Sequence, residues 1–516
     1  MRERLVTAAI GAARWNYVGF LCRSLASFFV GIVLARLLGP KPFGQLAVAA
    51  IVFGLGNQIA DAGFSSALVQ APDLTPRQIR CAFTMQVLIG LGMTAFAFVA
   101  APYLGVVFRD PGIVQILRAV SPLFLLQGIG QTSTGLLKRR MDFRAIQVAQ
   151  ISSYLFGYAG LGVLGALLGW GVWSLVAAQL AQPLLYAVVV YRCTRHSVRP
   201  CLDRSGFRLF RFGTQITGAN IINWAISNLD NVLVARTFGP LSLGLYSRMF
   251  DLASNPAQGF VSTCQQVLFA SCSRAEQRIE RMRRAYLATV GAVALITMPL
   301  FWSMAACSRF VVVGLFGQRW SEGVPLFTAF ATAMPFFALM APAGPILAAA
   351  DLVRREIRTQ AASLLVSAIV FLLATRISLA AVACAVVLAY GFRFWCTTRP
   401  TLRLLDLHWR DVFTVCAGPA CAATFCAACV FGAAHTGIIR AAHPMITLAA
   451  LGLIGATSLA AAALLGRTRV VPVAVLLPLL ASENNLPLFI ARPLKRFALQ
   501  PEHVPVSVEA AGIDVI

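Results

Sequence analysis

The chain has 516 residues, of which 59% are hydrophobic and only 12% charged. About a quarter of the residues of a typical soluble protein are charged, so this composition excludes a soluble globular protein and predicts an all-α integral membrane protein. The net charge is +24, from 43 Lys and Arg against 19 Asp and Glu. Because the basic residues stand in short clusters between long apolar stretches, membrane topology explains this charge better than a nucleic-acid partner does.

Apolar stretches long enough to cross a bilayer follow one another along the chain. A helix needs about 20 residues to span the hydrocarbon core, and a window of that length finds fourteen such stretches. Residues 470–480 are too short to span, and Pro472 and Pro478 interrupt them, so we expect this segment at the interface. The fourteen predicted spans are centred near Ser27, Phe53, Thr94, Leu125, Tyr158, Leu180, Ala225, Phe250, Ala294, Pro335, Ile369, Ala385, Thr424 and Gly455.

The predicted spans group into two lobes. Residues 1–191 hold the first six spans and residues 212–398 the next six, with a basic cytosolic loop, residues 192–211, between them. Residues 399–465 add two C-terminal spans, and residues 466–516 form a cytosolic or interfacial tail. The expected fold is therefore two six-helix bundles followed by two extra helices.

The distribution of Lys and Arg predicts the orientation in the membrane. With a cytosolic N-terminus, 31 basic residues fall in cytosolic segments, 6 in outer segments and 6 within spans. Short cytosolic loops are enriched in Lys and Arg, so we expect both termini in the cytosol. The outer connections are short, which leaves no outer domain to hold an active site, and we expect no enzymatic activity.

The 13 cysteines show no pattern of metal ligands or disulfides. Most of them lie inside apolar segments. Cys193, His196 and Cys201 share the basic loop, but their spacing matches no zinc site. We therefore expect no metal site and no cofactor.

A short motif is repeated at an offset of 200 residues. Residues 34–46 read LARLLGPKPFGQL and residues 234–246 read VARTFGPLSLGLY. Each copy joins the outer end of one span to the next through a Gly-Pro turn. Six spans lie between the copies, so the halves enter the membrane in the same direction and are related by a pseudo-twofold axis along the membrane normal. The identical pairs are Ala35/Ala235, Arg36/Arg236, Gly39/Gly239, Pro40/Pro240 and Gly44/Gly244.

These motifs and the span count resemble the polysaccharide-transporter family. The resemblance rests on RLLGPxxFG after the first span and on DNVLVARTFGPLSLGLYSR, residues 230–248, around the seventh. The family comprises the Wzx-type flippases of the multidrug/oligosaccharidyl-lipid/polysaccharide (MOP) superfamily, whose fold is MATE-like. The resemblance implies a bacterial inner-membrane transporter that moves undecaprenyl-diphosphate-linked oligosaccharide outward for exopolysaccharide, capsule or lipopolysaccharide synthesis. Implied partners are membrane lipids, a coupling ion such as H⁺ or Na⁺, and the polysaccharide polymerase and chain-length machinery.

Charges inside the first lobe give candidates for substrate contact. A charge at a span centre costs about 2.5 to 3.5 kcal/mol on insertion. Arg23 shares a helical face with Asn16 and Ser27, so it belongs to a polar stripe. Arg36 lies at an outer span end, from which its side chain can anchor at the headgroups.

Arg118 and Asp61 lie nearer the ends of their spans. Arg118 is close to the outer end of the fourth span and Asp61 close to the cytosolic end of the second. The position of Asp61 favours a gate or capping residue over a coupling site.

Polar stripes recur in spans seven and eight. They must face protein or water rather than lipid. Asp251 lies three residues after Arg248, so the two form either a self-neutralising structural pair or part of a substrate site. The two stripes are Asn220, Asn223, Ser227 and Asp230, and Arg248, Asp251, Asn255 and Gln258.

Together these residues predict a wet cationic cleft. Arginine suits a diphosphate because its planar group donates two parallel hydrogen bonds and keeps its charge. We predict substrate contact at Arg23, Arg248 and Arg118, and ion coupling or charge pairing at Asp230, Asp251 and Asp61.

Energy supply and two alternative functions can be judged from the same residues. The sequence has no GxxxxGK[ST] loop, so an ion gradient is the expected source of energy. A multidrug exporter of the MOP superfamily would favour acidic residues for its cationic substrates. A membrane polymerase or ligase would need a larger outer loop than this chain has.

Overall fold

The computed structural model describes residues 2–61, 68, 74–201, 204–274, 279–349, 353–435, 447 and 450–459. All regular structure in these residues is helical, and all fourteen predicted span centres lie on helices. In the described part of the chain, seven helices are long and apolar enough to cross a membrane. The chain divides into two compact units: unit 1 is Met1–Leu252, Arg309–Phe327 and Val366–Val386, and unit 2 is Ala253–Ser308, Thr328–Leu365 and Val387–Ile516.

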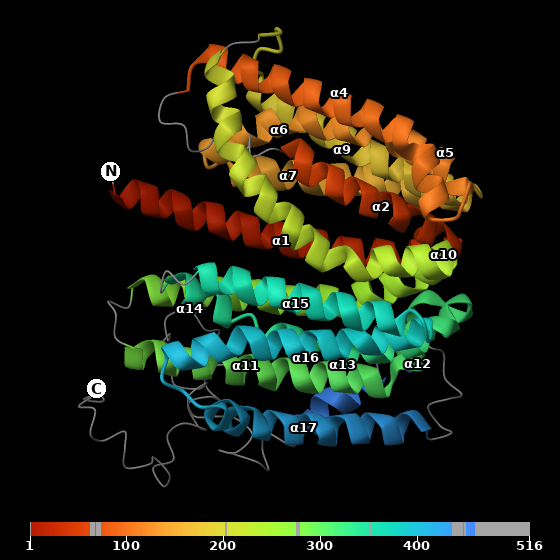
Figure 1. Cartoon of the computed structure of the whole chain (residues 1–516), viewed down its shortest axis with the longest axis vertical. Coiled ribbons are helices and arrows are strands. Elements are labelled where there is room, and N and C mark those ends of the chain that lie inside the picture. The colour runs from red at the N-terminus through yellow and green to blue at the C-terminus, as the bar shows by residue number, and fades with distance from the viewer. Residues whose placement is uncertain are drawn as a thin grey trace. The chain divides into compact units, whose positions relative to one another are not determined.

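Unit 1 contains the helices that position the site. In it α6 packs against α4 and α9, α1 packs along α7 and α8, and α2 lies against α5, α6 and α9 (Figure 1). Their bounds are α1 (Arg2–Leu38), α2 (Pro40–Asp61), α4 (Pro76–Val107), α5 (Gly112–Val120), α6 (Leu123–Arg139), α7 (Phe143–Ser153), η1 (Tyr154–Gly160), α8 (Leu161–Leu167) and α9 (Val172–Thr194).

Two predicted spans of unit 1 are broken helices. The span near Leu125 consists of α5 and α6, and at the break the Thr94 hydroxyl shares its proton between the Gly90 carbonyl at 2.8 Å and the Ser121 carbonyl at 3.1 Å. Such a partner is required because a free backbone carbonyl is costly in a membrane. The span near Tyr158 changes from α7 to the π-helix η1 and then to α8. π-Helical turns are often found at functional sites.

Side-chain caps fix where two of these helices begin. At the start of α4 the Gln78 backbone N–H donates to the Thr75 hydroxyl at 3.3 Å, and the Gln78 side chain accepts from the Thr75 N–H at 2.9 Å. At the start of α7, Asp142 accepts from the Ala145 N–H at 3.0 Å. Each cap satisfies donors that the first helical turn leaves unpaired.

The two copies of the repeated motif adopt the same conformation and meet each other. Gly39 and Gly239 have φ of 74° and 79°, which glycine adopts without steric cost. Gly239 is the kink of α10 (Arg204–Arg274). A Cβ on Gly44 would overlap the Pro240 carbonyl, and a Cβ on Gly244 would overlap the Pro40 carbonyl. The predicted Gly-Pro turns are therefore confirmed, and their helices approach backbone to backbone.

Unit 2 is organised around α11 and α17, which pack along each other. Its buried core includes Tyr286 and Val290 of α11, Leu339 of α13 and Val412 of α17. The first of the two predicted C-terminal spans is thus part of a helical core. The helices that lie wholly or mostly in this unit are α11 (Ile279–Ala306), α13 (Val324–Leu339), α14 (Ala343–Ala349), α15 (Val353–Ala374), α16 (Leu379–Leu404) and α17 (Trp409–His435); α12 (Ser308–Phe316) and η2 (Gln318–Gly323) belong almost entirely to unit 1.

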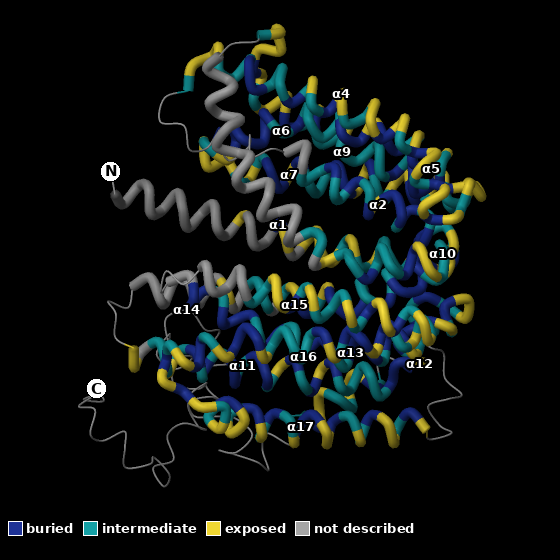
Figure 2. Tube along the Cα trace, in the orientation of Figure 1, coloured by how far each residue is buried: buried dark blue, intermediate teal, exposed yellow. Residues whose placement is uncertain are grey.

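Large apolar side chains lie on the outside of the helices. On α4, Phe96, Val99, Tyr103 and Val106 are each at least 67% exposed, and their spacing places them on one helical face. Figure 2 shows exposed and intermediate positions running along α4. A face of this kind is unusual in water and suits contact with lipid.

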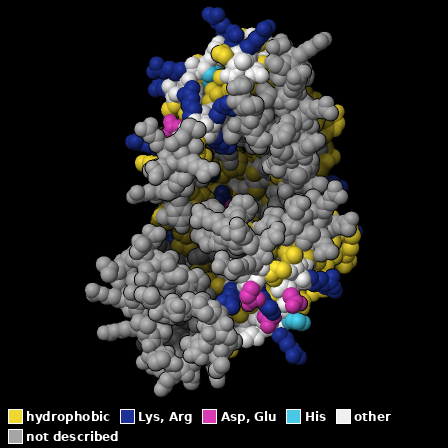
Figure 3. Space-filling view, turned by 90° about the vertical axis from the view of Figure 1, so that its left-hand side faces the viewer, with side chains coloured by type: hydrophobic (Ala, Val, Ile, Leu, Met, Phe, Trp, Pro, Cys, Tyr) yellow, Lys and Arg dark blue, Asp and Glu magenta, His cyan; other side chains and the backbone are white. Residues whose placement is uncertain are grey.

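Basic residues of unit 1 gather at one end of its helices. Arg77 and Arg80 stand at the start of α4, Lys138 and Arg139 at the end of α6, and Arg192 at the end of α9. Figure 3 views the molecule from the side of Figure 1 on which α1 begins, and there Lys and Arg side chains cluster. This is the end that the sequence assigns to the cytosol.

Candidate functional site

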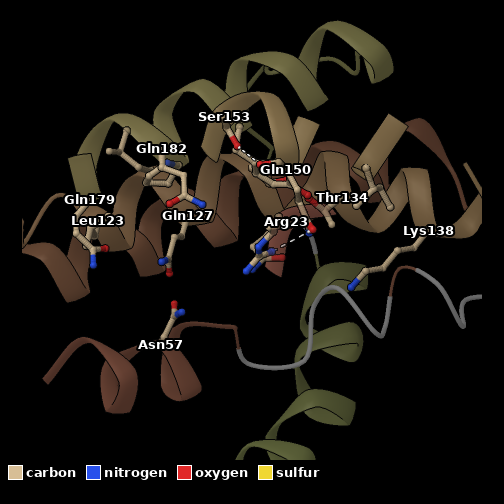
Figure 4. A pocket seen from close by; sticks show the side chains of 16 residues that line it. Arg23, Asn57, Leu123, Gln127, Thr134, Lys138, Gln150, Ser153, Gln179 and Gln182 are labelled. Carbon is tan, nitrogen blue, oxygen red and sulfur yellow. Dashed lines mark hydrogen bonds between the residues drawn. The ribbon is translucent and has the colours of Figure 1, made fainter. Parts of the chain in front are cut away.

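Unit 1 contains an open polar cavity with a volume of about 520 Å³. Side chains from α1, α2, α6, α7 and α9 line it, and they converge on one space in Figure 4. The volume is typical of a small-ligand pocket, which is about 300 to 1,000 Å³. Six of the lining side chains are amides: Asn57, Gln127, Gln131, Gln150, Gln179 and Gln182.

Arg23 reaches this cavity from α1. Its guanidinium donates a hydrogen bond to Oε1 of Gln150 on α7 at 3.2 Å (Figure 4). One turn further along α1, Ser27 is hydrogen-bonded to Tyr154 of η1. The predicted polar stripe of α1 therefore faces α7 and η1; the side chain of its third member, Asn16, lies outside the described residues.

A chain of hydrogen bonds continues from Gln150 across the cavity wall. The Gln150 side chain is hydrogen-bonded to the Tyr186 hydroxyl. That hydroxyl lies 3.0 Å from the Thr134 hydroxyl, which donates to the Gly130 carbonyl at 2.9 Å. The chain joins α7, α9 and α6, so the surroundings of Arg23 are fixed by three helices.

The charges in the cavity are positive. Arg23 and Lys138 line it, and none of the described lining residues is Asp or Glu. Amide and hydroxyl groups both donate and accept hydrogen bonds, as the hydroxyl groups of sugars do. The cavity can therefore bind an anion such as phosphate beside a hydroxyl-rich group.

Arg248 lies close to a ring and to a carboxylate. Its guanidinium carbon is 4.0 Å from the centroid of the Phe43 ring, and Nη1 is 3.7 Å from Oδ2 of Asp251. Tyr154 of η1 lies within electrostatic range of both Arg23 and Arg248. Arg248 is thus paired with Asp251, in the same unit as Arg23.

Asp230 has a different environment from the cavity. Its side chain is 8% exposed, accepts from the Tyr246 hydroxyl at 2.8 Å and accepts from the Asn231 N–H at 2.9 Å. These bonds are what a buried carboxylate needs for stability. A role for Asp230 in ion coupling stays a prediction.

Two predicted residues, Arg118 and Asp61, remain, and neither is among the described lining residues of the cavity. The Arg118 guanidinium is exposed and stands 5.0 Å from the centroid of the Phe98 ring, and Arg118 is not among the lining residues. Asp61 is the last residue of α2, and its side chain lies outside the described residues.

Arg36 binds protein rather than standing free at the headgroups. It donates to the carbonyl of Leu315 at 2.7 Å and to that of Gly314, near the C-terminal end of α12. The carbonyls there are electronegative, and a cation stabilises them. The Trp320 indole, which is fully buried, donates to the Ala35 carbonyl at 3.0 Å. The repeated motif at this end is therefore held by residues far along the chain.

His196 attaches the basic loop to the helix ends. Its ring lies 5.2 Å from the ring of Phe83 and 5.3 Å from that of Tyr191, measured between centroids. Nε2 is 3.1 Å from the Ser133 hydroxyl, and Nδ1 is 3.4 Å from the Ser197 carbonyl. A carbonyl can only accept, so Nδ1 carries the hydrogen and Nε2 accepts from Ser133. Burial lowers the pKa of His196 below its ordinary value of 6.5.

This histidine gives a prediction for the pH dependence of stability. Because burial lowers the pKa of His196 in the folded protein, the unfolded chain binds more protons at this residue as the pH falls below about 6.5. We expect the thermal unfolding temperature to fall as the pH drops below that value. The fall should be smaller in His196→Gln, measured on purified protein between about pH 7.5 and 5.5. An equal fall in both proteins would contradict a neutral buried His196.

The amide residues of the cavity were not predicted from the sequence, because the candidates were sought among charged residues within the spans. Their spacing is the signal that could have found them, because Gln127, Gln131, Thr134 and Lys138 lie on one face of α6. Gln179, Gln182 and Tyr186 do the same on α9.

The fold and the sequence both have known relatives. The succinoglycan biosynthesis transport protein ExoT of Rhizobium meliloti (strain 1021) is 30% identical over 295 residues, 57% of this chain and 60% of ExoT. The match thus spans less than two thirds of that relative. The structure of lipid II flippase MurJ in an inward closed conformation aligns with a TM-score of 0.68 at 11% identity, over 90% of this chain and 99% of MurJ.

A second solved structure extends the comparison. An inward-facing MATE family transporter of the MOP superfamily aligns with a TM-score of 0.57 at 14% identity, over 74% of this chain and 95% of the transporter. At these identities the likeness shows the fold alone, and it confirms the predicted all-α membrane transporter fold. The family described as polysaccharide biosynthesis protein matches residues 33–325. Since this match covers more than half of the chain, the protein belongs to the polysaccharide biosynthesis protein family.

Proposed function

We propose that the protein is a flippase that moves a lipid-linked oligosaccharide from the cytosolic to the outer leaflet of the bacterial cytoplasmic membrane for polysaccharide synthesis. The observation that carries the proposal is the cavity of unit 1, where two cations stand among six amides. A diphosphate fits the cations, and sugar hydroxyls fit the amides. The names of ExoT and MurJ agree with this class of transport.

The route of the substrate follows from the positions of the cations. Lys138 lies at the basic end of α6 and Arg23 faces Gln150 on α7. We propose that the diphosphate enters past Lys138 and is held at Arg23 while the sugars contact the glutamines. In this proposal the lipid chain stays in the bilayer, so its apolar surface is not exposed to water during transport.

The energy source belongs to the same proposal. The two predicted lobes, residues 1–191 and 212–398, would alternate access to the cavity, with both termini in the cytosol. An ion gradient would drive the change, and one charge crossing about 100 mV gains about 2.3 kcal/mol. Asp251, beside Arg248, is the described carboxylate best placed to couple an ion.

A multidrug exporter fits the cavity less well. Cationic drugs need acidic or aromatic partners, and the described lining residues supply two cations and no carboxylate. Deletion of the gene tests the proposal. We expect loss of surface polysaccharide and accumulation of lipid-linked oligosaccharide in the cytosolic leaflet, both restored by the full chain. Normal surface polysaccharide in the deletion strain would overturn the proposed function.

A further inference from the structure

The partner of Arg23 is uncharged. An arginine inside a membrane protein usually pairs with a carboxylate, because an unpaired charge is costly there. Arg23 instead donates to the amide oxygen of Gln150 at 3.2 Å. Its charge is therefore oriented by a neutral group and is not cancelled.

The hydrogen-bond chain behind Gln150 fixes which end of the amide faces Arg23. Thr134 gives its only proton to the Gly130 carbonyl, so in the 3.0 Å contact with Tyr186 the tyrosine must be the donor. The Tyr186 oxygen is then free to accept from the Gln150 amide nitrogen. This leaves the amide oxygen of Gln150 for Arg23, as observed.

A carboxylate at position 150 would change both contacts. It would pair with Arg23 and cancel its charge, and it would have no N–H to donate to Tyr186. Among the described residues, the titratable groups around position 150 are Arg23 of α1, Lys138 of α6, Tyr154 of η1 and Tyr186 of α9. None of these four is a carboxylate that could neutralise Arg23.

From this geometry we infer that Gln150 is a positioning residue that sets the charge selectivity of the cavity. It aims the Arg23 guanidinium into the cavity and preserves its full charge for an anionic ligand, the phosphate group of the substrate. The inference rests on the proposed function, since it concerns the same cavity and the same ligand.

The test is binding of inorganic pyrophosphate to the purified full chain in detergent, measured by isothermal titration calorimetry. Gln150→Glu should weaken binding by about 10- to 100-fold, the range for hydrogen bonds to charged groups. Gln150→Leu removes both hydrogen bonds but adds no charge, so it should weaken binding less than Gln150→Glu does. Gln179→Glu adds a carboxylate to the same cavity at a residue that is not hydrogen-bonded to Arg23 in the described part of the chain, and it should also have the smaller effect.

A double-mutant cycle separates pairing from general repulsion. In an Arg23→Gln background, Gln150→Glu should cause little further loss. Thermal unfolding of each variant checks folding, and Gln150→Asp supplies the same charge if Gln150→Glu is not recovered folded.

The outcomes distinguish the two proposals. A wild-type protein that binds no pyrophosphate would overturn the proposed function and, with it, the role of Gln150. Wild-type binding with Gln150→Leu as damaging as Gln150→Glu, or with no coupling to Arg23, would overturn the role of Gln150 alone.

Discussion

Gly44→Ala and Gly244→Ala should each destabilise the protein strongly and reduce the amount that folds in the membrane. In either variant the added Cβ meets backbone rather than a flexible side chain: on Gly44 it would lie 2.6 Å from the Pro240 carbonyl carbon, and on Gly244 3.0 Å from that of Pro40. The two helices must move apart, which costs about 1 to 3 kcal/mol for overpacking of this kind. Thermal unfolding of purified protein and the folded yield from membranes measure the effect.

Gly92→Ala is the matched control for these variants. A Cβ on Gly92 of α4 has no neighbour within 4 Å, so there the same substitution should be neutral or stabilising through helix propensity, by at most about 1 kcal/mol. In the double variant Gly44→Ala with Gly244→Ala, the second change should cost less than the first, because the helices have already separated. Equal stability of Gly44→Ala and Gly92→Ala would contradict the backbone contact.

Arg23→Ala should abolish transport, while Arg23→Lys should reduce it in part. Lysine keeps the charge and can still donate to Gln150, but it loses the planar fork that binds two phosphate oxygens. Complementation of the deletion strain, with the membrane level of each variant measured in parallel, gives the result.

Arg118→Ala is the control, because Arg118 stands over the Phe98 ring and outside the cavity lining. It removes the same charge and should retain most of the transport. Loss of protein to the same degree in Arg23→Ala and Arg23→Lys would instead mean that Arg23 only braces the helices.

The helices could be predicted because an apolar run of about 20 residues has few alternatives in a bilayer. The Gly-Pro turns could be predicted too, since the motif repeats, and Gly39 and Gly239 adopt nearly the same φ. The break between α5 and α6 falls at Ser121 and Pro122; proline interrupts a helix, but a search for apolar stretches does not register it. The π-helix η1 could not be predicted, because hydropathy does not register a change in helical hydrogen bonding.

The candidate site was predicted in part. Arg23 could be identified because a charge stands out in an apolar span. The glutamines were missed because a single amide changes the hydropathy of a window very little. Arg118 was predicted to contact the substrate but is not among the lining residues of this cavity, because depth in a span does not tell which face of the helix meets a cavity.

The contact between Gly44 and Gly244 has the form of an isologous dimer interface inside one chain. In such an interface the same patch occurs on both partners, and each contact occurs twice, with the two partners exchanged. Here Pro40 meets Gly244 and Pro240 meets Gly44, and each glycine nitrogen lies 2.8 Å from the Cβ position of the other. A local twofold axis therefore passes between the two glycines. A half-length homodimer would close on this same pair of residues, each supplied by a separate subunit.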